Sequence, residues 1–71
     1  MIGPFVTNKN PMNGASLKAW RRRLGLTQRQ AGEKLGIPAI TISGWETGRL
    51  QIARPKMLEL ECRAVELDIA G

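Results

Sequence analysis

One segment constrains the fold more than any other, because residues 27–48 carry the signals for two short helices joined at a glycine. Thr27 and Gln30 have the spacing of a capping box, in which the side chain of each accepts a hydrogen bond from the backbone N–H of the other. Gly36 follows the last residue of the apolar pattern, and a residue without a Cβ favours the left-handed conformation that ends many helices. The spacing therefore predicts one helix between Thr27 and Gly36.

The second helix of this segment is predicted between Pro38 and Gly48. Proline is tolerated in a first helical turn because the N–H that it lacks has no partner there. Ile42 and Trp45 lie three residues apart and predict the face that packs inward. Gly32, inside the first helix, costs about 1 kcal/mol of helix propensity relative to alanine, and we interpret it as a point of close packing with the second helix.

One further helix is expected on each side of this pair. Ser16 is expected to cap the earlier one, which places Trp20 on its apolar face, and Pro55 suits the first position of the last one. The 71 residues allow one domain, and no alternating apolar runs indicate strands. We therefore expect an all-α fold, a small four- or five-helix bundle over residues 16–71. Residues 1–15, rich in Gly, Pro and Asn, are expected to be a flexible tail.

Charge is divided unevenly along the chain. Residues 1–56 hold ten Lys or Arg residues against two Glu residues, a net charge of +8, whereas residues 57–71 hold one Arg against four acidic residues, a net charge of −3. A basic field of this kind attracts a polyanion and speeds the encounter with it. The basic part coincides with the two-helix segment, which favours nucleic acid as the partner.

Missing residue types exclude several classes of site. Cys62 is the only cysteine, and the chain has no His or Tyr. One chain therefore forms no intramolecular disulfide, zinc site or Cys–His nucleophile pair, and no acids are placed for acid–base catalysis. We predict that the protein is not an enzyme and binds no metal or cofactor, with Cys62 in the core. No apolar run approaches the ~20 residues that span a bilayer, so we expect a cytoplasmic protein without a membrane partner.

Over about residues 16–68 the chain resembles the Cro and phage-repressor helix-turn-helix family, also called the xenobiotic-response-element family. The matching residues are Leu17, Arg21, Gly25-Leu26-Thr27-Gln28, Ala31, Leu35-Gly36-Ile37, Thr41-Ile42-Ser43, Trp45-Glu46 and Gly48. The resemblance implies a phage-repressor type of bundle and an ion pair between Arg21 and Glu46. The chain departs from the family pattern at Pro38, where a capping serine is common, and at Gly44, where a long polar or basic base reader is frequent.

The resemblance implies a regulator of transcription that binds double-stranded DNA by sequence and represses by occupying an operator as a homodimer. An antitoxin, which binds a toxin protein and autoregulates its operon, is the alternative, and a co-purifying partner would indicate it. A protein-interaction module on a degraded helix-turn-helix is a third possibility. Arg49 and Arg54 argue against that possibility because such a module has no need of basic residues near the groove.

Two sets of residues are predicted to contact DNA. The outer face of the second helix is small and polar, so base contacts are expected from Ala39, Ile40, Thr41, Ser43 and the open space at Gly44. These side chains offer hydroxyl hydrogen bonds and methyl contacts with thymine rather than bidentate contacts. Phosphate contacts are expected at the amino end of the first helix and in the loop after the second, from Gln28, Arg29, Thr47, Arg49 and Arg54.

The last helix carries more apolar residues than one core requires. One stripe is expected to face the core, at Leu58, Cys62, Val65 and Ile69. The second stripe is expected to form a dimer interface, at Met57, Leu60, Ala64 and Leu67. A fully buried central helix would also explain both stripes, but a terminal helix of so small a bundle is difficult to bury on all sides.

Overall fold

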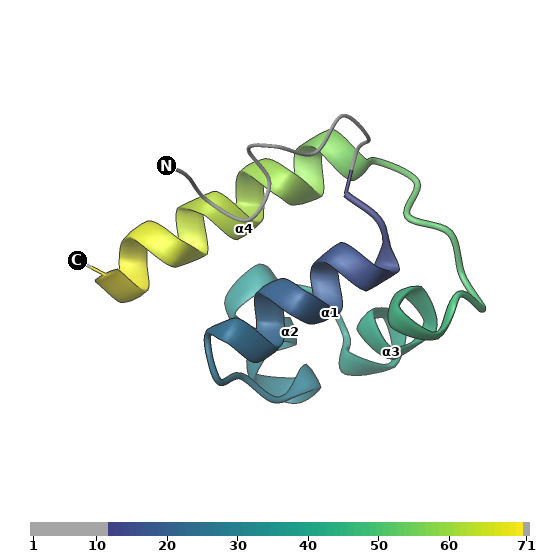
Figure 1. The fold of residues 1–71 in the computed structure, drawn as a ribbon, viewed down its shortest axis with the longest axis horizontal. Coiled ribbons are helices and arrows are strands. Elements are labelled where there is room, and N and C mark those ends of the chain that lie inside the picture. The colour runs from purple at the N-terminus through teal and green to yellow at the C-terminus, as the bar shows by residue number, and fades with distance from the viewer. Residues whose placement is uncertain (1–11, 71) are drawn as a thin grey trace.

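Four helices form, in the order that the sequence pattern predicts. The computed structural model describes residues 12–70 and contains α1 (Gly14–Arg23), α2 (Gln28–Leu35), α3 (Ala39–Thr47) and α4 (Pro55–Ala70), with no strand among those residues. The all-α prediction is therefore confirmed, with four helices among residues 12–70. The short helices α1, α2 and α3 pack together, and α4 runs along them with its C-terminal end extending past the others (Figure 1).

Helix α1 begins earlier than the sequence predicts. Its cap is Asn13, whose Oδ1 accepts a hydrogen bond of 2.9 Å from the backbone N–H of Ser16, so the assignment of Ser16 as the cap is wrong. Gly14 opens the helix against the end of α3, since a Cβ there would collide with the backbone carbonyl of Trp45. Met12 is buried as well. The expected boundary at residue 16 is thus too late, and residues 1–11 of the expected tail lie outside the described residues.

Both ends of α2 follow their sequence signals. The backbone N–H of Gln30 donates to Thr27 Oγ1 at 3.0 Å, and the N–H of Thr27 donates to Gln30 Oε1 at 2.9 Å, so the capping box is complete. Gly36 ends the helix with φ of +74°. The close approach expected at Gly32 is also present, because a Cβ there would collide with the carbonyl oxygen of Ile37. This contact sets the turn between α2 and α3.

The core lies between α4 and the three short helices, each of which contributes at least one buried residue. Trp20 is fully buried, and its indole N–H donates to Glu66 Oε2 at 2.8 Å, which joins α1 to α4. The other buried apolar residues are Met12, Leu17, Ala31, Ile42, Leu58, Cys62 and Val65. No helix among the described residues is long and apolar enough to cross a membrane.

Cys62 has the core position that the sequence predicts for it. Its thiol is free and buried, with Sγ 4.0 Å from Sδ of Met12. Desolvation, followed by the nearby charges of Glu66, Glu61 and Glu59, raises the pKa of the Cys62 thiol to about 12. A thiol with so high a pKa is a poor nucleophile, which agrees with a packing role.

Helix α4 buries one of its two apolar stripes. Leu58, Cys62 and Val65 are buried, whereas Ile69 is 44% exposed and marks the end of the core. The second stripe faces solvent at Met57, Leu60, Ala64 and Leu67, with Leu60 and Leu67 60% and 73% exposed. The stripe is not buried within the chain, so the alternative of a fully buried α4 is wrong.

Candidate nucleic-acid interface

Helices α2 and α3 are held at a fixed angle by a short turn and by an ion pair with α1. Pro38 caps α3 without a side-chain hydrogen bond, and its carbonyl accepts from the N–H groups of Thr41 and Ile42 at 3.0 and 3.2 Å. Ile42 is fully buried on the inward face, whereas Ile40 is 70% exposed on the opposite face. One side of α3 is therefore free of the core.

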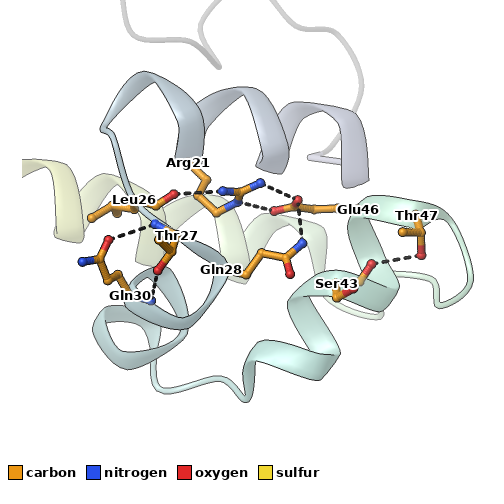
Figure 2. Close-up of polar contacts among 8 residues, drawn as sticks. All are labelled: Arg21, Leu26, Thr27, Gln28, Gln30, Ser43, Glu46 and Thr47. Atoms are coloured by element: carbon orange, nitrogen blue, oxygen red, sulfur yellow. Dashed lines mark hydrogen bonds and ion pairs between the residues drawn. The ribbon is translucent and has the colours of Figure 1, made fainter.

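The predicted ion pair between Arg21 and Glu46 is present and bidentate. Arg21 Nε donates to Glu46 Oε2 at 2.8 Å, and Nη2 donates to Oε1 at 2.9 Å (Figure 2). Arg21 Nη1 also donates to the carbonyl oxygen of Leu26 at 2.9 Å, in the link between α1 and α2. The two side chains are only 12% and 3% exposed. One guanidinium thus fixes the end of α3 and the start of α2 against α1.

Both partners of this pair are held in their charged forms. The hydrogen bond to Glu46 raises the pKa of Arg21, against an opposing effect of burial. Desolvation acts to raise the pKa of Glu46, but hydrogen bonds from Arg21 and Gln28, together with the charges of Arg21 and Lys18, lower it below its usual value. The pair is therefore fully ionised at neutral pH.

Gln28 lies beside this pair rather than pointing to solvent. Its Nε2 donates to Glu46 Oε1 at 3.2 Å, and Figure 2 shows the side chain directed from α2 toward α3. The sequence predicts a phosphate contact at Gln28 but not this second partner. The contact connects the first helical turn of α2 directly to α3, so that the amino end of α2 is positioned with the outer face of α3.

The residues predicted to contact bases do not form one uniform surface. Ile40 is well exposed, while Ala39, Thr41 and Ser43 are each half-buried. Thr47, which is predicted to contact phosphate, is exposed, but its hydroxyl donates to the carbonyl oxygen of Ser43 at 3.0 Å (Figure 2). Ile40 is therefore the most prominent side chain of the outer face.

The open space expected at Gly44 is not present, and this expectation is wrong. Gly44 is buried under Leu50, which follows in the loop after α3. The backbone N–H of Leu50 donates to the carbonyl of Gly44 at 3.0 Å, and a Cβ on Gly44 would lie 2.8 Å from Leu50 Cγ. The glycine makes room for a loop residue instead of leaving a gap for a base.

Exposed basic side chains lie in the segments before and after α3. Arg29, near the start of α2, is 86% exposed, and its Nε lies 3.8 Å from the exposed carboxylate of Glu33. Arg49 and Arg54 are exposed in the loop between α3 and α4. In contrast, the acidic residue of α3, Glu46, is covered and paired. The described part of the chain contains no group of three side chains suited to hold a metal ion.

A family model described as a helix-turn-helix domain matches residues 14–70, from the first residue of α1 to the last residue of α4. The chain belongs to the helix-turn-helix domain family. No curated protein and no solved structure gives a match. In helix-turn-helix domains that bind DNA, the second helix of the motif lies in the major groove, and the first crosses the backbone. Helix α3 has the place of that second helix, called the recognition helix, in this domain.

Leu50 is the site residue that sequence reasoning misses in this helix-turn-helix domain. Its only signal is its place six residues after Gly44, since a small residue in a helix can mark the approach of another segment. The spacing alone does not say which segment approaches. Leu50 remains 45% exposed in the structure. A single leucine in a loop belongs to no periodic apolar pattern, so the sequence does not indicate that it packs on α3.

Proposed function

We propose that this helix-turn-helix protein is a sequence-specific regulator that binds double-stranded DNA and represses transcription by occupying an operator as a homodimer. The observation that carries the proposal is the electrostatic arrangement of the recognition helix. Glu46, its acidic residue, is 3% exposed and neutralised by Arg21. The basic residues of the neighbouring segments are exposed, Arg29 in α2 and Arg49 and Arg54 in the loop after α3. A phosphate backbone is attracted to this side of the domain and meets no free carboxylate of α3.

Base contacts are proposed from the half-buried and exposed residues of the outer face. Ile40 suits contact with a thymine methyl group, and the hydroxyl groups of Thr41 and Ser43 suit single hydrogen bonds to base edges. Ala39, at the start of the helix, permits close approach to the groove. None of these four side chains makes a bidentate contact, so part of the sequence preference is expected from the shape of the DNA.

Phosphate contacts are proposed on both sides of the recognition helix. Gln28 and Arg29 would contact one run of phosphates, with the backbone N–H groups and dipole of α2 contributing at its amino end. Thr47, at the end of α3, and Arg54, in the loop, would contact the opposite run. Replacing Arg54 with alanine is expected to weaken binding to all duplexes alike and to reduce the log–log salt slope by about one unit.

The exposed apolar stripe of α4 is proposed as the dimer interface. It consists of Met57, Leu60, Ala64 and Leu67, spaced three, four and three residues apart as in a heptad seam. Two copies paired about a two-fold axis would place two recognition helices on half-sites about one helical turn apart. A single small domain is expected to bind only at about 10⁻⁴ to 10⁻⁶ M, so specific binding depends on the pair.

Selection of bound sites from random duplex DNA, at two salt concentrations, tests DNA binding and specificity together. The expected result is a palindromic site whose affinity falls steeply with salt. A chain that selects no sequence would contradict the proposal. If a small protein co-purifies with the chain through α4 and the selected site lies in its own operon, the antitoxin alternative is favoured instead.

Sedimentation tests the dimer. Leu60→Lys together with Leu67→Lys is expected to give a folded monomer that shifts the selected duplex only at much higher concentration. Ala15→Lys together with Ala19→Lys, on exposed positions of α1, adds the same charge and controls for it. An unmodified chain that sediments as a monomer at tens of micromolar, free and on its selected DNA, would exclude the dimer.

A further inference from the structure

We infer that Arg49 reads a guanine edge from the loop after α3, in the place of the side chain that Gly44 lacks. This inference rests on the proposed DNA-binding function and replaces the phosphate contact that the sequence predicts for Arg49. It gives the recognition surface a long, bidentate reader that none of the residues of the helix itself supplies.

Gly44 lies on the outer face of α3 although it is buried. Successive residues of a helix are about 100° apart, so Gly44 points about 160° away from Ile42, which is fully buried in the core. It points only about 40° away from Ile40, which is 70% exposed. The core therefore does not cover Gly44; the loop does.

The loop is fixed on that face at two points. Gly48 reverses the chain with φ of +80°, and its N–H donates to the carbonyl of Trp45 at 3.2 Å. Leu50 then donates its N–H to the carbonyl of Gly44 at 3.0 Å and rests its side chain on that residue. Arg49 lies between these two anchors, so its backbone is held beside the end of α3.

The guanidinium of Arg49 consequently lies over the outer face. Its Nη2 is 3.4 Å from the position that a Cβ of Gly44 would occupy. Among residues 12–70, no carboxylate lies within ion-pair distance of Arg49, although Arg21, Arg23, Arg29 and Arg63 each have one. The guanidinium is placed where a base-reading side chain would start, and its donors are not taken by a protein acid.

The chemistry of arginine suits guanine at this place. The planar guanidinium offers two parallel N–H donors that match the O6 and N7 acceptors of guanine in the major groove. Ile40 lies four residues before Gly44, a rise of about 6 Å along the helix, and base pairs are stacked about 3.4 Å apart. The required guanine is therefore expected within about two base pairs of the thymine that Ile40 contacts.

The experiment compares the selected duplex with a copy in which the required guanine pair is replaced by an adenine pair. The unmodified chain is expected to prefer the guanine duplex by about 5- to 100-fold, the range of a good bidentate contact. Arg49→Ala should bind both duplexes equally, because its affinity for the guanine duplex falls by at least about fivefold more than its affinity for the adenine duplex. Arg54→Ala, which removes the same charge from the same loop, should keep the preference. A guanine duplex carrying 7-deazaguanine should bind more weakly to the unmodified chain and to Arg54→Ala, but not to Arg49→Ala.

Three outcomes would overturn the inference. Equal loss of affinity for both duplexes in Arg49→Ala would make Arg49 a phosphate contact, while the proposed function would stand. A selected site without a required guanine would also reject the inference and leave the function intact. A chain that selects no sequence would reject the function and the inference together. Thermal denaturation of each variant is the control that tests whether its domain is folded.

Discussion

The indole N–H of Trp20 donates to the carboxylate of Glu66 at 2.8 Å, 46 residues further along the chain. The second oxygen of the same carboxylate lies 3.0 Å from Nη2 of Arg23. Glu66 thus links two residues of α1 to α4, one inside the core and one at its edge. The contact satisfies a polar group that would otherwise be buried without a partner.

Trp20→Phe is expected to lower the free energy of unfolding by about 1–3 kcal/mol, because Glu66 loses a buried donor and the smaller ring leaves space in the core. Chemical denaturation measures the change. Arg23→Gln removes the outer contact of Glu66, in which the arginine is 49% exposed, and should cost less than about 1 kcal/mol. Equal effects of the two changes would show that the indole hydrogen bond contributes little.

Glu46→Gln is expected to destabilise the domain by about 3 kcal/mol, since it leaves the guanidinium of Arg21 buried without its counter-charge. Glu33→Gln is the matched control, because that carboxylate is 70% exposed and lies 3.8 Å from Arg29. The control should melt within about 0.5 kcal/mol of the unmodified chain. If Glu46→Gln melts with the control, the ion pair does not stabilise the fold.

The same ion pair predicts an acid-sensitive stability. The pKa of Glu46 is lower in the folded chain than the value of about 4.3 in an unfolded chain. The unfolded state therefore binds the proton more tightly, so the contribution of Glu46 is complete above about pH 5 and is lost as the pH falls through the folded value. The difference in stability between the unmodified chain and Glu46→Gln should shrink below about pH 4. A difference that stays constant down to pH 3 would contradict the assignment.

Gly32→Ala is expected to destabilise the domain by about 1–3 kcal/mol, although alanine favours a helix more than glycine does. The new methyl group would meet the carbonyl oxygen of Ile37, a backbone atom that cannot move aside without disturbing the turn. Glu33→Ala, at an exposed position of the same helix, should change the stability little. A Gly32→Ala chain that melts above the unmodified one would show that the turn relaxes.

Local signals in the sequence predict the ends of α2, because Thr27, Gln30 and Gly36 act within one helical turn of their targets. They fail at the start of α1, where Asn13 and Ser16 can both act as caps. The choice depends on Gly14, which must fit against the end of α3, and on Met12, which must reach the core. Those contacts are tertiary, so the spacing of polar residues does not reveal them.

The candidate site, too, contains contacts that the sequence predicts and contacts that it does not. The family resemblance predicts the pair of Arg21 and Glu46, and the structure contains it. The second partner of Glu46 is Gln28, which depends on the angle between α2 and α3. The covering of Gly44 by Leu50 depends on the path of the loop after α3. A pattern of residue types within α3 cannot specify the path of a segment that follows it.

The packing of Leu50 on Gly44 also limits how the proposed reading of DNA by this domain could be redesigned. A long side chain introduced at position 44 would occupy the place of the leucine and release the loop from the helix. A change of reader would therefore be accompanied by a change in loop stability, and the two effects would be confused in any single variant. A new specificity therefore requires paired changes, in which a larger residue replaces Gly44 and a smaller residue replaces Leu50.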